Sequence, residues 1–516
     1  MPVPLARLVC RAQIGLAAPL VQVEVALACG LPAFSIVGLP APVVKESRER
    51  VRAALLSSGF DFPGGRIIIN LAPAEIPKEG GRFELPMALG ILIASGQLPG
   101  LSREALARCE LYGELGLDGA IKPVRGIFLA AAHASRDGHE LIIPSANAEE
   151  ALISAHTPVR AAPCLRAVWA HLTGRATLPV CAPELPSRAH VGAGAAAPDL
   201  AEVRGQIQAK RALLIAASGH HSLLMIGPPG CGKSMLANRL PGLLPPLTES
   251  EALECAAITS VSAAGFHAGA FGRRPFRAPH HTASAVALVG GGAQARPGEV
   301  SLAHNGVLFL DELPEFGRRV LEVLREPLEA GIVRVARAAA HADYPAEFQL
   351  LAAMNPCPCG HLGDARAPCR CTPAQVSAYR ARISGPLLDR IDMHVLVPPL
   401  DVAAFADPAA ASEASAVAAQ RVLRTRNRQL ARQGRYNGRL ADAQVQSCCV
   451  LEPPARALLE RAIGELGLSA RARQRVLKLA RTIADLADAA EIGPAHVGEA
   501  VMLRCLDRPE VISSCP

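Results

Sequence analysis

Gly227-Pro-Pro-Gly-Cys-Gly-Lys-Ser234 matches every fixed position of the phosphate-binding pattern G-x-x-x-x-G-K-[ST]. An apolar run at residues 223–226 precedes it and a helical pattern at 235–240 follows, which is the strand–loop–helix context that the motif requires. Lys233 is predicted to reach the β- and γ-phosphates, and Ser234 is predicted to hold magnesium. Backbone N–H groups and the helix start favour phosphate along the whole loop, which comprises Gly227, Pro228, Pro229, Gly230, Cys231, Gly232, Lys233 and Ser234.

Two acids and an amide follow further apolar runs and complete the pattern. Asp311 and Glu312 come directly after residues 307–310, and Asn355 ends the run 350–354. Asp311 is predicted to orient the magnesium shell and Glu312 to polarise the attacking water. Asn355 is predicted to hold that water or the γ-phosphate, although an asparagine after a strand is weak evidence alone. An acidic helix start is the alternative for the acid pair. Together the segments predict ATP and Mg²⁺ as cofactors.

Composition places the chain among large, multidomain proteins without a membrane anchor. Its 516 residues suggest about two to four domains. No apolar run reaches the roughly 18 residues of a membrane span, and we expect no signal peptide. Fifteen cysteines in a nucleotide-site protein favour reduced thiols and a cytoplasmic location. The net charge of +7 is compatible with a nucleic-acid partner without establishing one.

Changes in pattern along the chain divide it into five parts. Alternating strand signals and helical patterns fill the first part, and a Pro/Ala/Gly-rich stretch follows it. The phosphate-binding loop lies in the third part, an Arg-rich connector comes fourth, and helical periodicity marks the end. The predicted boundaries are 1–182, 183–198, 199–400, 401–440 and 441–516.

Several longer signatures are more specific than the phosphate-binding loop. They are LPAFSIVGLP at 31–40, NLAPAEIPKEGGRF at 70–83, RPFRAPHH at 274–281 and MNP at 354–356. In these the chain resembles, nearly end to end, the ComM-type family of magnesium-chelatase-like AAA+ ATPases.

The resemblance implies an α/β architecture in three folded units. These would be an N-terminal Lon-protease-like (ribosomal S5 domain 2-like) α/β domain, a central AAA+ P-loop α/β domain and a C-terminal helical lid. It also implies a bacterial cytoplasmic ATPase that assembles as a homo-oligomer, a hexameric ring. Such a protein is expected to act as a DNA helicase that promotes branch migration during natural transformation.

The Lon-like resemblance raises a protease function, which the residues argue against. The segment 77–84 is similar to the one that carries the Lon serine, but Arg82 stands at that place. The segment 123–128 is similar to the one that carries the Lon lysine, and Phe128 is near the expected position. A serine nucleophile is weak without its base. We therefore expect a catalytically dead domain that serves as a scaffold or contacts DNA.

Two arginines are candidates because of the resemblance. The segment 384–392 is similar to the family's arginine-finger motif, which makes Arg390 the expected finger; an ordinary Arg–Asp surface pair is the alternative. Arg471, after the possible helix cap Ser469, fits a second sensor arginine, and a solvated basic helix start is the alternative. Arg473 and Arg475 lie so close to Arg471 in the sequence that either of them could be the second sensor instead.

Four cysteines in a Pro/Gly-rich loop directly after Asn355 have the ligand set of a structural zinc site. Free thiols are the alternative, and His361 could replace one ligand. The candidates for Zn²⁺ are Cys357, Cys359, Cys369 and Cys371.

Basic clusters are the candidates for contact with DNA. One is an arginine-rich segment without acids, for which a solvated connector helix is the alternative. A second lies in the insert before Asp311, and the resemblance implies that residues 332–337 belong to a hairpin facing the ring pore. Aromatic platforms are missing, which favours tracking of the phosphate backbone, whether single-stranded or branched. The first cluster is Arg421, Arg424, Arg426, Arg428, Arg432, Arg435 and Arg439, and the second is Arg273, Arg274, Arg277, His280 and His281.

Two other functions remain open from the sequence. A magnesium-chelatase subunit resembles the core, but that subunit type lacks this N-terminal domain. An ATP-dependent regulatory switch would recruit proteins without moving DNA. Stimulation of ATP hydrolysis by DNA is expected for a motor and is not required of either alternative.

Overall fold

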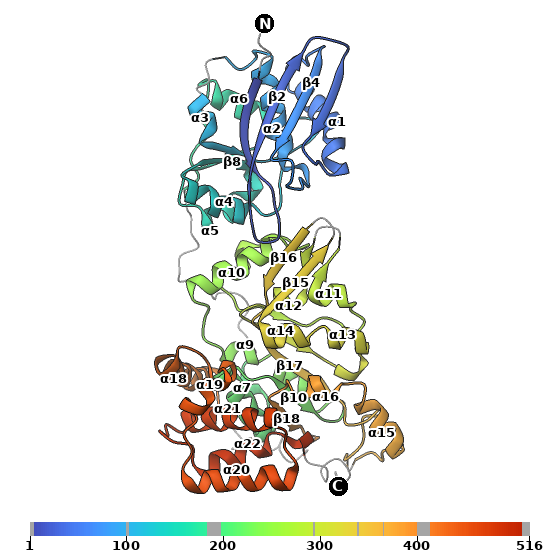
Figure 1. The fold of residues 1–516 in the computed structure, drawn as a ribbon, viewed down its shortest axis with the longest axis vertical. Coiled ribbons are helices and arrows are strands. Elements are labelled where there is room, and N and C mark those ends of the chain that lie inside the picture. The colour runs from blue at the N-terminus through green and yellow to red at the C-terminus, as the bar shows by residue number, and fades with distance from the viewer. Residues whose placement is uncertain are drawn as a thin grey trace.

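The computed structural model stacks three units along its long axis, with the N-terminal unit at one end and the helical C-terminal unit at the other (Figure 1). The predicted linker at 183–198 lies outside the described residues apart from residue 198, as do residues 401–412 of the predicted connector. The structure describes residues 5–99, 103–182, 198–292, 295–337, 340–364, 366–399 and 413–507.

The N-terminal unit is a seven-stranded mixed sheet covered by helices, with the order β3-β4-β2-β1-β5-β8-β9. Strands β1, β2 and β4 pair antiparallel, and the others pair parallel. Alternate residues of β2 are buried, as expected for a sheet with one face on the core. The strands are Leu5–Arg11 (β1), Leu20–Ala28 (β2), Ala33–Val37 (β3), Arg66–Ala72 (β4), Cys109–Leu111 (β5), Glu140–Pro144 (β8) and Val159–Ala162 (β9).

Helix α2 is the central helix of this unit and is apolar on nearly every face, which is why almost all of it is buried. It packs on β1 and β2, and the other helices lie around it and along the sheet. The main helices are Pro42–Ser57 (α1), Glu84–Ala94 (α2), Ile127–Asp137 (α4), Ala148–Ser154 (α5) and Leu165–Leu172 (α6).

The central unit contains a five-stranded sheet in which every pair is parallel, with the order β11-β14-β17-β10-β18. The strands β10, β14 and β17 are buried along their whole length, as parallel strands covered on both faces are. Ligands of such sheets bind outside the carboxyl ends of the strands. The strands are Phe276–Arg277 (β11), Val307–Leu310 (β14), Gln349–Met354 (β17), Leu223–Ile226 (β10) and Met393–Leu396 (β18).

Two separate segments extend the central unit toward the N-terminal unit. One is helix α10 (Glu249–Ser260), which begins at a capping box between Thr248 and Glu251, and the other is the hairpin of β15 (Ile332–Arg337) and β16 (Ala340–Pro345). The loop between β1 and β2 reaches this hairpin (Figure 1). There the backbone of Gly15 passes so close to Ala342 that an added Cβ would lie 2.8 Å from its Cβ atom.

The C-terminal unit is helical and packs on α7 (Ile207–Gly219) of the central unit. Residues 415–433 of the predicted connector form its first long helix, which contacts α7 and α21. The apolar side chains of the unit continue the core beneath the five-stranded sheet. Its helices are Ser415–Gln433 (α18), Asp442–Cys448 (α19), Pro453–Leu466 (α20), Ala470–Leu486 (α21) and Pro494–Met502 (α22).

Candidate nucleotide-binding site

Lys233 occupies the first position of helix α8 (Lys233–Ala237), where Gly232 adopts φ +93°. Its side chain is buried within the loop, and Nζ donates to the carbonyl oxygens of Gly227 at 2.7 Å and Pro228 at 2.9 Å. Nζ also donates to Asn355 Oδ1 at 3.2 Å. The structure therefore brings the lysine of the first segment against the asparagine of the third.

The residues predicted to hold magnesium also meet. Ser234 Oγ donates to Asp311 Oδ2 at 2.6 Å, and the other oxygen of Asp311 accepts from the backbone N–H of Glu312 at 2.9 Å. A hydroxyl and a carboxylate in contact offer the hard oxygen ligands that Mg²⁺ prefers, with room left for water and phosphate oxygens. These residues fit a magnesium ion bound together with a nucleotide.

Glu312 has an interaction that sequence reasoning missed. Its backbone is left-handed, with φ +53°, and its side chain is half exposed. Oε2 lies 3.2 Å from His281 Nδ1. His281 follows β11, which pairs with the strand that ends before Asp311. Spacing in the sequence does not reveal this pair, because the carboxylate comes from the end of the adjacent strand.

Asn355 lies between the two other segments because β17 runs between β10 and β14. All three strands are parallel, so their carboxyl ends meet at one edge. Four predicted residues, Lys233, Ser234, Asp311 and Asn355, are thereby in direct contact at that edge, and Glu312 adjoins them.

Arg390 is not brought to the phosphate-binding loop of its own chain by any contact among the described residues. It follows the short helix α16 (Gly385–Leu388), and 8 % of it is exposed. Its guanidinium donates to the carbonyl of Pro386 at 2.6 Å and pairs with Glu329 at 2.5 Å. Arg390 therefore forms an ion pair within its own chain, as in the alternative of an ordinary ion pair, although its partner is a glutamate and the arginine is largely buried.

Arg471 lies in the first turn of α21, which Ser469 caps through a hydrogen bond to the N–H of Ala472, and it is exposed. Arg475 pairs instead with the buried Asp392. Burial raises the pKa of Asp392, but the Arg475 charge and hydrogen bonds from His221 and Ser222 outweigh it and hold this pKa far below its usual range. Because Arg475 is used in this junction between core and lid, Arg471 and Arg473 remain as sensor candidates.

The four predicted zinc ligands converge. The Sγ atom of Cys357 lies 3.4 Å from that of Cys359 and 3.7 Å from that of Cys369, and the latter two are 3.6 Å apart. Cys371 joins the same group within 4.8 Å. The pKa of Cys359 is lowered to about 6 because the backbone N–H groups of His361 and Arg370 donate to its sulfur.

Arg82 and Phe128, the positions that the Lon-like resemblance compares with a protease dyad, make structural contacts. Arg82 is buried and donates to the carbonyl oxygens of Arg11 and Arg125, and burial lowers its pKa. Phe128 packs on Phe266 of the central unit, with ring centroids 6.2 Å apart. That the domain is catalytically dead stays a prediction.

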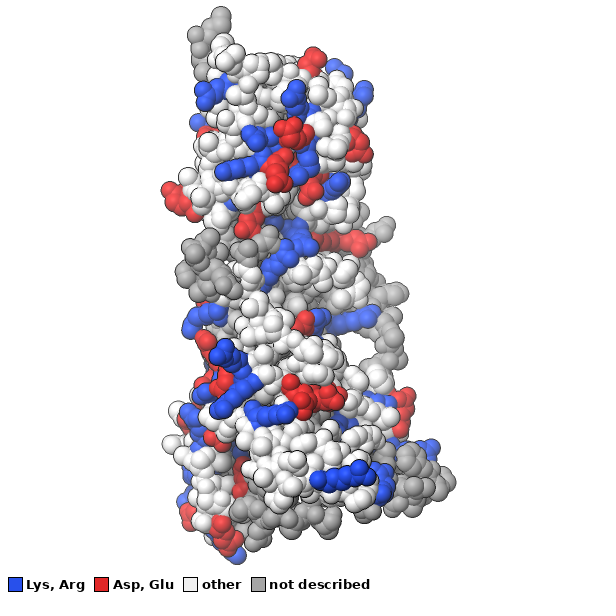
Figure 2. All heavy atoms as spheres, turned by 90° about the vertical axis from the view of Figure 1, so that its right-hand side faces the viewer, with Lys and Arg blue, Asp and Glu red and all other residues white. Residues whose placement is uncertain are grey.

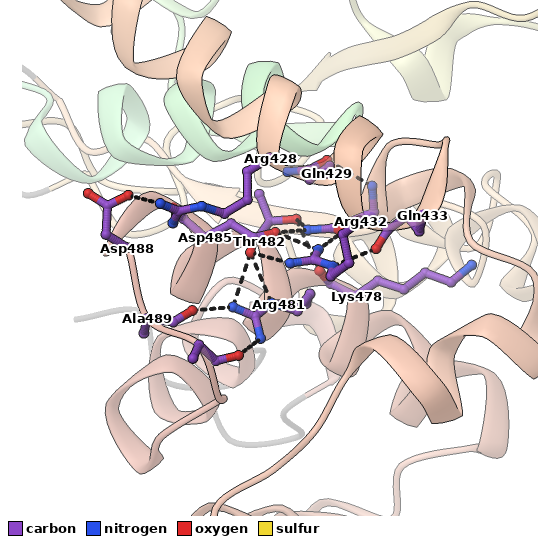
Figure 3. Close-up of polar contacts among 12 residues, drawn as sticks. Arg428, Gln429, Arg432, Gln433, Lys478, Arg481, Thr482, Asp485, Asp488 and Ala489 are labelled. Carbon is purple, nitrogen blue, oxygen red and sulfur yellow. Dashed lines mark hydrogen bonds and ion pairs between the residues drawn. The ribbon is translucent and has the colours of Figure 1, made fainter.

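The structure corrects the expectation that the arginine-rich segment is a surface for phosphate. Arg426 is buried, stacks on Tyr436 and donates to the carbonyl of Ala217. Arg432 pairs with the buried Asp485, and Arg428 reaches Asp488 (Figure 3). The others used within the chain are Arg421, which pairs with Glu413, and Arg439, which donates to Phe348, whereas Arg424 and Arg435 are exposed.

Two arginines of the second basic cluster also have partners within the chain. Arg274 donates to the carbonyl oxygens of Pro245 and Asn305, and Arg277 pairs with Glu299 at 2.6 Å. Arg273 is exposed. On the face shown in Figure 2, basic side chains are interspersed with acidic ones and form no continuous band.

The fold and these contacts define the class of protein. A parallel sheet carries a phosphate-binding loop after one strand, an acid pair after another and an asparagine between them, and a helical unit follows. This is a P-loop nucleotide-binding protein with the AAA+ layout.

Comparison with known proteins identifies the family. The chain matches the magnesium chelatase subunit ChlI over residues 199–405, a second ChlI description over 23–147 and its C-terminal part over 412–504. It is 47% identical to the uncharacterized protein YifB of Salmonella typhimurium, over 96% of both chains. It is 46% identical to the competence protein ComM of Haemophilus influenzae, over 96% of this chain and 97% of the relative. The chain therefore belongs to the ComM-type family of magnesium-chelatase-like proteins. Among the described residues, no helix is long and apolar enough to cross a bilayer.

Proposed function

We propose that this protein is an ATP-driven, ring-forming DNA motor, a helicase that promotes branch migration of recombination intermediates in natural transformation. The observation that carries the proposal is the meeting of three distant segments in one site. Lys233 touches Asn355 and Ser234 touches Asp311, although more than a hundred residues separate the first two. A site of this kind binds and hydrolyses a nucleoside triphosphate with Mg²⁺.

Each residue has a separate task in the proposed hydrolysis. Lys233 exchanges its carbonyl partners for β- and γ-phosphate oxygens, and Ser234 and Asp311 hold the magnesium ion. Glu312 accepts a proton from the attacking water, and Asn355 orients that water or the γ-phosphate. When bound by Ser234 and Asp311, magnesium would supply positive charge against the charge that develops on the phosphates.

A homo-oligomeric ring, which we propose to be a hexamer, completes the site. Arg390 has no contact with its own phosphate-binding loop among the described residues, as expected of an arginine that serves a neighbouring subunit. Release from Glu329 would free its guanidinium to stabilise the transferred phosphoryl group. Arg471, exposed at the start of α21, is proposed to contact the nucleotide from the lid.

DNA is proposed as the substrate on two grounds. A relative that is alike over almost the whole chain is named a competence protein, and the net charge is +7. The hairpin of β15 and β16, with the exposed Arg334, is proposed to follow the DNA backbone in the pore without reading its sequence. A cytoplasmic location is proposed because the described cysteines are all free thiols.

The proposed cofactors are ATP and Mg²⁺ together with a structural Zn²⁺. The four converging thiols of Cys357, Cys359, Cys369 and Cys371 have the donor set of a closed tetrahedral zinc site. When bound, such an ion holds a loop in place and takes no part in hydrolysis.

Stimulation of ATP hydrolysis by DNA tests the proposal against two alternatives. The matches to magnesium chelatase favour a chelatase-like subunit as the second candidate, and a regulatory switch is the third. A motor should hydrolyse ATP several-fold faster with forked or four-way DNA. Binding of ATP with hydrolysis that no DNA stimulates would remove the motor and leave the alternatives.

A further inference from the structure

The thiol cluster has the dimensions of an occupied zinc site. Four sulfurs at about 2.3 Å from a tetrahedral zinc ion lie about 3.8 Å from one another. The Sγ separations among Cys357, Cys359 and Cys369 are 3.4, 3.6 and 3.7 Å. A disulfide needs about 2.05 Å between sulfurs, so the cluster is not an oxidised pair. Tetrahedral coordination accounts for the spacing with little rearrangement.

The loop that these cysteines close lies directly on the nucleotide site. Gly360 adopts φ +83°, and a Cβ added to it would lie 2.7 Å from Cδ and 2.8 Å from Cγ of Pro229 in the phosphate-binding loop. The same added atom would lie 4.0 Å from Cγ of Asn355. Gly360 therefore packs against Pro229 and lies near Asn355, and its missing side chain permits the approach to Pro229.

A hydrogen bond inside the loop fixes the turn at Gly360. Its N–H donates to the carbonyl of Cys357 at 3.0 Å, and Cys357 is fully buried. A separate turn follows, in which Asp364 accepts from Arg366. The thiol cluster joins the turn at Gly360, through Cys357 and Cys359, to the later residue Cys369.

We propose that Zn²⁺ bound by Cys357, Cys359, Cys369 and Cys371 holds Gly360 in contact with Pro229. This contact keeps the phosphate-binding loop in the conformation that binds nucleotide. This inference rests on the proposed nucleotide site and adds a metal-dependent control of it. Without the ion, the cysteines no longer hold the turn at Gly360 in place, and Gly360 is free to move away from Pro229. A phosphate-binding loop that is competent one-tenth of the time binds nucleotide about tenfold more weakly.

Two cysteine variants test the metal site and its effect together. Cys369→Ser and Cys371→Ser are compared with wild type and with Cys448→Ser, a matched control in the lid outside the cluster. Metal per protomer is measured by mass spectrometry, and the Kd of a fluorescent ATP analogue is measured in excess Mg²⁺. We expect one zinc per protomer in wild type and control. The two cluster variants should lose zinc and bind the analogue roughly tenfold more weakly.

Gly360→Ala tests the contact without removing a ligand. The added methyl group would collide with Pro229, so zinc should stay bound while nucleotide affinity falls. If a cysteine variant does not fold, a zinc-selective chelator applied to folded wild type in excess Mg²⁺ gives the same comparison, with the fold followed by circular dichroism.

The results separate this inference from the proposed function. Wild type that binds nucleotide but holds no stoichiometric zinc would overturn the inference alone. Loss of zinc with unchanged Kd would overturn the control over the phosphate-binding loop. Wild type that holds zinc but binds no adenine nucleotide would refute the proposed function, and with it the effect on affinity.

Discussion

Glu312 lies at the edge of the nucleotide site with its side chain half exposed and one oxygen directed to His281. This oxygen can accept a proton from water only when the imidazole does not hold it. The neighbouring Asp311 is committed to Ser234 and to a backbone N–H. The two adjacent acids therefore have different partners, which agrees with the proposed roles of Asp311 at magnesium and of Glu312 at the attacking water.

Glu312→Gln should bind ATP with nearly unchanged affinity and lose turnover by a factor of about 10² or more, since a general base contributes that much. Steady-state phosphate release and nucleotide Kd are the two measurements. The matched control is Glu315→Gln, an exposed acid in the same short turn that pairs with Arg382. Normal turnover in Glu312→Gln would assign the water to another group.

At the residue scale, the sequence predicted the residues of motifs that have a fixed spacing. It did not predict contacts that depend on the order of the strands in the sheet. The phosphate-binding loop is a local motif, so Lys233 and Ser234 could be named directly. His281 could not be paired with Glu312 because the register of β11 beside β14 is a tertiary fact. Arg426 could not be recognised as buried because its partners, Ala217 and Tyr436, come from outside its own helix.

Helix α21 is held to its neighbours by a buried carboxylate. Asp485 is fully buried and accepts from Arg432, Arg481 and Asn437 (Figure 3). The three donors come from different elements, α18, α21 and the turn after α18. Arg432 of the arginine-rich stretch thus belongs to the lid's own polar core, which periodicity and composition alone could not show.

Asp485→Ala should destabilise the lid by about 3–5 kcal/mol, because its removal leaves the buried guanidinium of Arg481 without a counter-charge. Thermal and urea unfolding measure this change. Asp488→Ala is the control, since Asp488 is exposed and pairs with Arg428 at the surface. The control should cost about 0–1 kcal/mol. Equal losses in both variants would contradict the role given to Asp485.

Strand β18 carries a histidine that should make stability depend on pH. Burial and the charge of Arg504 lower the pKa of His394 from 6.5 to about 4, although Asp507 and Asp392 oppose this shift. Between these values the unfolded chain takes up a proton that the folded chain resists. Stability should therefore fall as pH drops from 6.5 to 4, by up to about 1.4 kcal/mol per unit.

Urea unfolding of wild type and His394→Gln at pH 7, 6 and 5 measures this contribution. The variant lacks the titrating group, so its stability should fall less steeply over that range. Identical slopes in the two proteins would show that His394 titrates normally in the fold.

We propose that the protein hydrolyses ATP only as an oligomer, and the position of Arg390 supports this proposal. Its own chain holds it at Glu329 and Pro386, away from its own nucleotide site. The overall architecture of α/β units and a helical lid was predicted from the resemblance and is confirmed by the fold and the family matches. The docking of the β1–β2 loop on the hairpin at Ala342 was not predicted, because no local sequence pattern encodes a contact between units.

Arg390→Ala alone should lose about 10³-fold or more in hydrolysis if the arginine acts on a neighbour's phosphate. A mixture of Arg390→Ala with Lys233→Ala should recover part of the activity, since some interfaces then combine an intact loop with an intact arginine. Hydrolysis is measured across mixing ratios at constant total protein. Full activity of Arg390→Ala by itself would assign the finger to another arginine.

Branch migration of a labelled four-way DNA junction by purified protein tests the central claim most directly. With ATP and Mg²⁺, wild type should convert the junction to its duplex products, and Lys233→Ala should leave it intact under the same conditions. A wild-type protein that binds and hydrolyses ATP yet leaves four-way and forked DNA unchanged would contradict the proposal of a DNA motor.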